Sequence, residues 1–136
     1  MTITKLTKMK SKVINTLFFE KLKLSLFTDP EEYNKHLTKL GYQADAVNNE
    51  GCAAFVNQCA LVFVAYNKPE NVKDLAYLQS VLTHEASHIV DDIFDAVGET
   101  NPGTETRAYL IEKITLGLFE LYFEERDSDF MLMPRV

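Results

Sequence analysis

The sequence predicts an α+β domain whose helices, above all two long C-terminal ones, collect on one face of a small β-sheet. Three patterns indicate this class. A strictly alternating run at 21–27 and an apolar hairpin at 51–66 indicate strands, while apolar residues recur at helical spacing over 72–97 and 104–124. The 136 residues, 46% of them hydrophobic and 25% charged, have the size and composition of one globular domain, which we assign to 1–136.

The first part of the chain is expected to form a frayed N-terminus, a strand and a short helix. Residues 1–12 are rich in lysine and are expected to form a frayed basic N-terminus. In "KLKLSLF" (21–27) leucines alternate with lysine and serine, which is typical of a half-buried strand. A helix follows, because Asp29-Pro30 is a helix start signal and Gly41 is a stop signal.

The hairpin at 51–66 determines where the two cysteines lie. A two-residue turn at 57–58 sets Cys52 opposite Phe63 and so keeps Cys52 and Cys59 apart. Two cysteines without Cys-x-x-Cys spacing indicate small buried side chains rather than a disulfide or a metal pair.

The two long helices are separated by "GETNPG" (98–103). The first is expected to run from about 72 to 97 and to end at Gly98, and the second from about 104 to 124. The final "RDSDFMLMPRV" (126–136) fits neither a helical nor a strand pattern and receives no assignment.

The charge and the apolar runs argue against two kinds of partner. A net charge of −6 disfavours nucleic acid, because phosphate binding needs clustered positive charge. No stretch approaches the ~20 apolar residues of a membrane span, and Glu20, Lys21 and Lys23 interrupt the run that imitates a secretory signal. We therefore expect a soluble, cytoplasmic protein with no nucleic-acid or membrane partner. The oligomeric state is not indicated.

The strongest functional signal is "HEASH" at 84–88, a His-Glu-x-x-His motif in the first long helix. One side of this helix carries an apolar stripe, made by Leu75, Leu78, Leu82, Ala86, Ile89, Ile93 and Val97. His84 and His88 lie on the opposite side, one turn apart, where two imidazoles can bind one tetrahedral zinc ion at ~2.0–2.1 Å. Glu85 is rotated by about 100° from His84, so it can contact a water on the metal rather than the metal. The motif thus supplies two ligands and a base.

A catalytic zinc site needs a third protein ligand, and the second long helix offers two candidates. Glu105, Tyr109 and Glu112 share the face opposite its apolar stripe. A simple antiparallel pair of helices favours Glu112, whereas a steeply crossed pair favours Glu105. The residues alone leave this choice open.

"THEASHIVDDIFDAVGE" (83–99) followed by "TETRAYL" (104–110) resembles zincins with a downstream glutamate ligand. It is most similar to small zincin-like metallopeptidases encoded by tailed bacteriophages. The resemblance extends back through the "GCAA" and "KLKLSLFTD" segments and covers about residues 20–115. It implies a minimal zincin-like domain in the host cytoplasm, with Glu105 as the third zinc ligand. The short link through "NPG" then requires a tight crossing of the two helices.

Further polar residues near the motif each have two interpretations. Tyr109 can donate a hydrogen bond to a developing oxyanion or can simply pack against its neighbours. Asp91, Asp92 and Asp95 can hold the outer nitrogens of the histidines or can be solvated helix acids. Arg107 can bind a substrate carboxylate or can pair with one of these aspartates.

Two functional hypotheses follow. The first is a zinc-dependent metallopeptidase acting on a peptide or protein, with zinc on His84, His88 and Glu105 and with Glu85 as general base. A hairpin strand at 59–66 is expected to align the extended substrate. The second is a catalytically silent binding protein that keeps the zincin scaffold and neutralises a partner protein. The presence of Glu85 favours the enzyme, because a purely structural zinc site needs no base.

Overall fold

The protein is a layered arrangement of one sheet and three helices. The computed structural model describes residues 9–16, 18–42, 50–65 and 68–123. Within these ranges the elements are, in chain order, β1 (Met9–Ile14), β2 (Leu22–Phe27), α1 (Pro30–Lys39), β3 (Gly51–Val56), β4 (Cys59–Val64), α2 (Val72–Ala96) and α3 (Thr104–Phe123).

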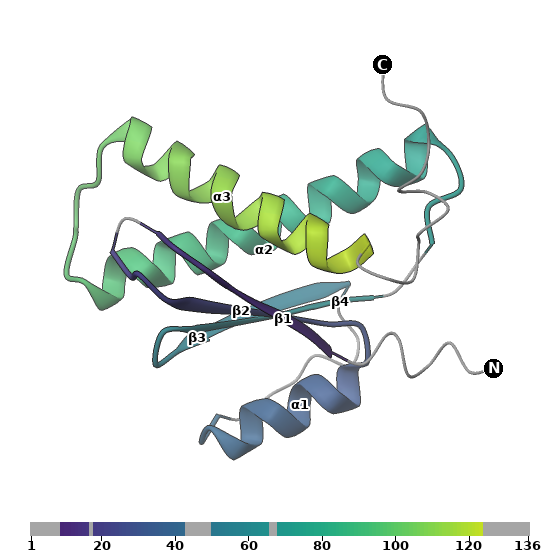
Figure 1. The fold of residues 1–136 in the computed structure, drawn as a ribbon, viewed down its shortest axis with the longest axis horizontal. Helices are drawn as coiled ribbons and strands as arrows, with labels where there is room; N and C mark the ends of the chain where they lie inside the picture. The colour runs from purple at the N-terminus through teal and green to yellow at the C-terminus, as the bar shows by residue number, and fades with distance from the viewer. Residues whose placement is uncertain (1–8, 17, 43–49, 66–67, 124–136) are drawn as a thin grey trace.

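The sheet is mixed, with the strand order β1-β2-β4-β3. β1 and β3 run antiparallel to their neighbours, and the two central strands β2 and β4 run parallel to each other. Helices α2 and α3 cross each other above one face of the sheet, and α1 lies below the other face (Figure 1). The predicted α+β class and the placement of the two long helices on one face are confirmed. The expectation that the helices collect on one face is wrong for α1.

The strand β1 was not expected from the sequence, which predicts a frayed terminus over 1–12. Residues 9–12 instead pair with β2, and the Ser11 hydroxyl hydrogen-bonds the Ser25 hydroxyl at 2.8 Å. The Lys12 ammonium donates to the Glu120 carboxylate on α3 at 2.5 Å. Lysines are common on edge strands, because they discourage pairing with other chains, so a basic composition does not exclude a strand. Residues 1–8 lie outside the described part of the chain.

Local sequence signals account for the ends of the helices and for the hairpin. The Asp29 side chain accepts from the Glu31 backbone N–H at the start of α1, and Asn71 does the same for Asp74 at the start of α2. Asn57 and Gln58 both have positive φ, 52° and 62°, as a two-residue turn between strands requires.

The register of the hairpin confirms the predicted separation of the cysteines. Cys52 pairs with Phe63 and Cys59 pairs with Val56, and no disulfide joins the two thiols. The strand β4 is buried along almost its whole length, because α2 and α3 cover one of its faces and α1 covers the other. Among the described helices, none is long and apolar enough to cross a membrane.

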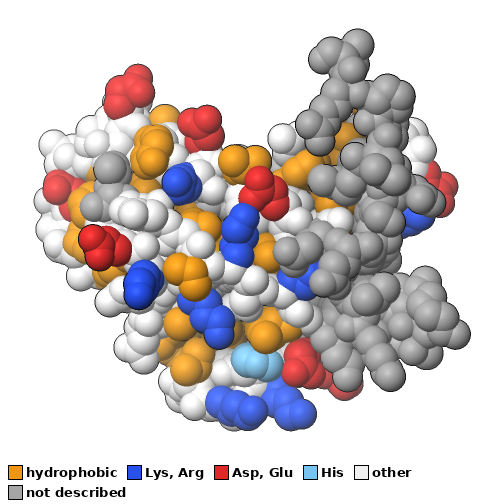
Figure 2. Space-filling model, in the orientation of Figure 1, with side chains coloured by type: hydrophobic (Ala, Val, Ile, Leu, Met, Phe, Trp, Pro, Cys, Tyr) orange, Lys and Arg blue, Asp and Glu red, His pale blue; other side chains and the backbone are white. Residues whose placement is uncertain are grey.

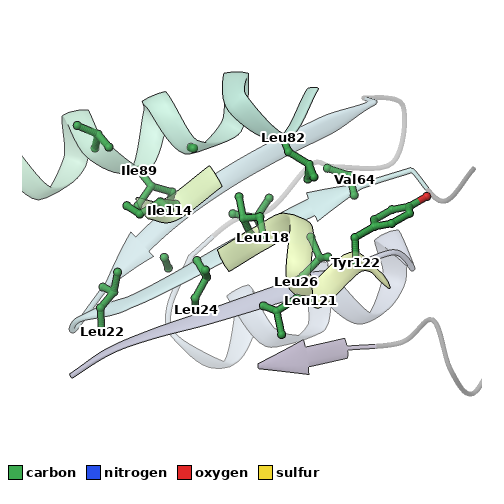
Figure 3. Close-up of a cluster of buried hydrophobic side chains, with 14 of the residues drawn as sticks. Leu22, Leu24, Leu26, Val64, Leu82, Ile89, Ile114, Leu118, Leu121 and Tyr122 are labelled. Atoms are coloured by element: carbon green, nitrogen blue, oxygen red, sulfur yellow. The ribbon is translucent and has the colours of Figure 1, made fainter. Parts of the chain in front are cut away.

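The main core lies between the sheet and the two long helices (Figure 3). Leucines on alternate positions of β2 meet Leu82 and Ile89 of α2 and Ile114 and Leu118 of α3, and these helix residues are fully buried. The apolar stripe predicted for α2 is therefore correct in its central part. Val97 is an exception at 40% exposure, because the helix ends before it. The core holds one side of α2 against the sheet.

Candidate functional site

The two motif histidines converge on one point in space. The His84 and His88 side chains are exposed on α2, and their Nε2 atoms are 3.2 Å apart. Two nitrogens bound at ~2.0–2.1 Å to one tetrahedral ion would lie about 3.3–3.4 Å apart. The observed spacing is thus close to that of two corners of a zinc tetrahedron. A hydrogen bond between one neutral ring and the other accounts for the same distance when no metal is present.

Glu85 is buried, unlike its two neighbours in the motif. Its side chain is 4% exposed, and its Oε1 has no hydrogen-bond partner among the described residues. Buried polar atoms in native proteins are nearly always paired, so an unpaired buried carboxylate oxygen requires an explanation. Such energetically unfavourable buried groups are common at functional sites.

The first residue of β3 makes room for this carboxylate. A Cβ atom at Gly51 would lie 2.7 Å from Glu85 Oε2 and 3.1 Å from the Phe63 carbonyl oxygen. Only glycine allows the strand to approach α2 so closely at this point. Glu85 is thereby held against the start of the edge strand.

The electrostatics of Glu85 combine two opposing effects. Burial raises the pKa of the Glu85 carboxyl above its usual range, while the nearby His84 and His88 lower it. Tyr33 of α1 is influenced by the same carboxylate. Burial raises the pKa of its phenol strongly, and the nearby Cys52 and Glu85 add to the rise. The sequence pointed to neither Gly51 nor Tyr33, since each is far from the motif along the chain.

The candidate residues on α3 lie apart from the histidine pair. Glu105, Tyr109 and Glu112 are exposed. In the described part of the chain, no His, Cys, Asp or Glu completes a group of three that could hold a metal. Glu112 lines a groove between the two long helices together with Thr83, the residue before His84. The choice of Glu105 as third ligand therefore stays a prediction.

The structure assigns Arg107 one of its two expected roles. The Arg107 guanidinium donates to the Asp91 carboxylate at 2.6 Å and lies over the Phe94 ring, 5.2 Å from its centre. This pair ties the first turns of α3 to the second half of α2. The pKa of the neighbouring Asp92 is raised by burial first, then by the charges of Asp95 and Asp91, with His88 opposing them.

A groove of about 590 Å³ runs along the outer edge of β3. Its walls come from α1 on one side of the sheet and from the second half of α2 on the other, and Asp92 and Asp95 lie on the α2 wall. The sequence predicts that the strand at 59–66 aligns a substrate, and this is wrong. β4 is paired along both edges, whereas β3 pairs only with β4 among the described strands.

Replacement of Gly51 by alanine is expected to destabilise the protein by about 1–3 kcal/mol, because the added methyl group clashes with Glu85 and with β4. Chemical denaturation measures the effect. A Gly103→Ala variant is the matched control, since a Cβ there meets its nearest atom at 4.0 Å. In a Glu85→Ala background, Gly51→Ala should lower the free energy of unfolding by less, with a coupling energy between the two substitutions of about 0.5–3 kcal/mol. Equal stabilities for the two glycine variants would contradict the close approach of Gly51 and Glu85.

No protein-family model matches the chain, and no curated protein or solved structure matches it.

Proposed function

We propose that the protein is a zinc-dependent metallopeptidase with a zincin-like site on α2. The observation that carries this proposal is the buried carboxylate of Glu85, whose Oε1 has no hydrogen-bond partner among the described residues, beside two converging, exposed imidazoles. A structural histidine pair has no need of a buried acid at its side. The resemblance of residues 83–99 and 104–110 to zincins of tailed bacteriophages supports the same activity.

Imidazole nitrogens and a carboxylate are ligands that zinc commonly takes. The distance between the Nε2 atoms of His84 and His88 is also close to that between two corners of a zinc tetrahedron. His84 and His88 would hold the ion through their Nε2 atoms, and Glu105 would be the third ligand. Bound zinc would polarise a peptide carbonyl and lower the pKa of water. Glu105 lies in the first turn of α3, next to the link 98–103. We expect metal binding to draw this end of α3 toward His88.

Glu85 is the base in this proposal. Its carboxylate accepts a proton from the water that attacks the peptide carbonyl carbon, and it then delivers this proton to the nitrogen of the leaving amine. Burial raises the pKa of Glu85 and so moves it toward the pH at which a general base is most effective. The extended substrate would lie along the free edge of β3, which starts at the Glu85 carboxylate.

One observation favours a second function. Among the described strands, the open edge of β3 is suited to binding an extended chain. This edge favours a zincin-like binding protein that neutralises a partner without cleaving it. Such a protein, zinc-bound or metal-free, needs no general base.

The purified protein is expected to take up one zinc ion per chain. Elemental analysis after zinc supplementation measures this, and removal of zinc by a chelator should lower the melting temperature, because the ion joins α2 to α3. Glu105→Ala should weaken zinc binding, and Glu112→Ala, on the same face of α3, is the matched control. Failure to bind zinc at all would exclude the peptidase. Loss of zinc in the Glu112 variant alone would exclude Glu105 as the ligand.

A further inference from the structure

The groove along β3 has one largely apolar side and one acidic side. Its floor and its α1 side are formed by the short or apolar side chains of Tyr33, Leu37, Ala54 and others, and Ala96 adds to the opposite wall. The charged side chains that line it, among the described residues, are the carboxylates of Asp92 and Asp95. An apolar trough that ends in carboxylates matches a lysine or arginine, whose aliphatic stem packs while its cationic head stays near charge and water.

The distance from Glu85 to these carboxylates can be measured along two elements. On α2, Asp92 follows Glu85 by seven residues, or about 10.5 Å of helix. On β3, Ala54 follows Gly51 by three residues, or about 10 Å of strand. Gly51 contacts Glu85, and Ala54 lines the groove together with Asp92. The strand and the helix therefore run side by side from the motif to the acidic wall.

An extended chain on the free edge of β3 would follow the same line. It advances about 3.3 Å per residue, so a side chain at Asp92 belongs to a residue about three positions from the peptide group beside Glu85. Asp95 lies three residues beyond Asp92, and both aspartates line the groove. The two carboxylates can thus meet one cationic head.

The charged side chains that line the groove are acidic, although basic side chains gather elsewhere on the molecule. Lysine and arginine side chains gather over the strands and α1 in the view of Figure 2. The lysines of β2 and α1 are absent from the described lining of the groove. Asp92 is half-buried beside Asp95 and Asp91, so like charges repel there, and a bound cation would relieve that repulsion.

We propose that Asp92 and Asp95 select a lysine or arginine in the substrate, about three residues from the peptide group beside Glu85. This specificity rests on the proposed function for its peptide ligand. It does not require hydrolysis, so binding to the zinc-free protein tests it independently.

The test uses the full chain in a chelator and fluorescent, extended peptides of alanine and threonine. Each peptide carries one lysine, or norleucine at the same position, and the position is moved along the series. Fluorescence anisotropy should give about tenfold tighter binding for lysine than for norleucine at the best position. The difference should shrink as salt is added. The Asp92→Asn/Asp95→Asn double variant should bind both peptides equally, whereas Glu99→Gln, outside the groove lining, should keep the preference.

Three results would overturn the assignment: equal binding of lysine and norleucine peptides, an unchanged preference in the double variant, or no binding of any peptide. The peptidase proposal is tested separately. A lysine preference in a protein that takes up no zinc would leave the groove assignment intact and exclude the enzyme. Cleavage of both peptides at one rate, with equal binding, would exclude the groove assignment and leave the enzyme.

Discussion

Substitution of His84 or His88 by alanine is expected to abolish zinc binding and activity together. Each ring supplies one of the two nitrogens that converge at 3.2 Å, so a single substitution leaves α2 with one ligand. The loss of zinc affinity should exceed the ~10–100-fold that follows the loss of a residue outside the ligand set. Isothermal titration of the zinc-free proteins with zinc measures the change.

The fold should survive these substitutions. Both imidazoles are exposed, so the free energy of unfolding of the zinc-free variants should stay within about 0.5 kcal/mol of the wild type. His36→Ala is the matched control, because His36 lies on α1, where its Nδ1 contacts the Glu32 carbonyl. Zinc affinity retained in both His84→Ala and His88→Ala, or lost in His36→Ala, would place the metal elsewhere.

Local patterns predicted most elements because local forces form them. The stripe of α2 and the start signal at Asp29 act within a few residues, and α1 begins where that signal stands. The position of α1 depends on both faces of the sheet. The alternation in 21–27 indicates one buried face, whereas Phe27, Leu61 and Phe63 form a second cluster beneath α1. The continuous apolar run of β4 was the available signal, because a strand buried on both faces shows no alternation.

The site likewise contains features set by local sequence and features set by tertiary packing. His84 and His88 are four residues apart on one helix, so helical geometry alone brings their rings together. The contact between Glu85 and Gly51 joins residues 34 positions apart, and it depends on the pairing of β3 with β4 and on the packing of α2 over them. No local pattern carries such a contact. For the same reason the sequence favours the wrong strand of the hairpin, 59–66, for aligning a peptide, since which strand lies outside depends on the parallel pairing of β2 with β4.

Glu85→Gln is expected to lower the rate of peptide hydrolysis by about 10²–10⁴-fold while zinc binding is retained. Glutamine keeps the size of the side chain and removes the basic oxygen, and Glu85 is not among the proposed zinc ligands. Zinc content and initial rates, measured on the same preparations, separate the loss of the base from the loss of the metal. Glu99→Gln removes the same charge from an exposed site after α2 and should leave the rate unchanged.

The same substitution is expected to make the zinc-free protein more stable near neutral pH, and the sign follows from the pKa of Glu85. Burial raises this pKa in the folded chain above its value in the unfolded chain. Between the two values the folded state binds more protons, so the free energy of unfolding of the wild type falls as the pH rises through that interval. Glutamine does not titrate, so the variant lacks this fall and gains on the wild type as the pH approaches neutrality. Denaturation at a series of pH values should show the gap closing toward acid pH. A gap that does not change with pH would mean that the pKa of Glu85 is not raised in the folded chain.

Full biological effect in Glu85→Gln, together with its loss in His84→Ala, would mean that the zinc is structural and that the protein acts by binding.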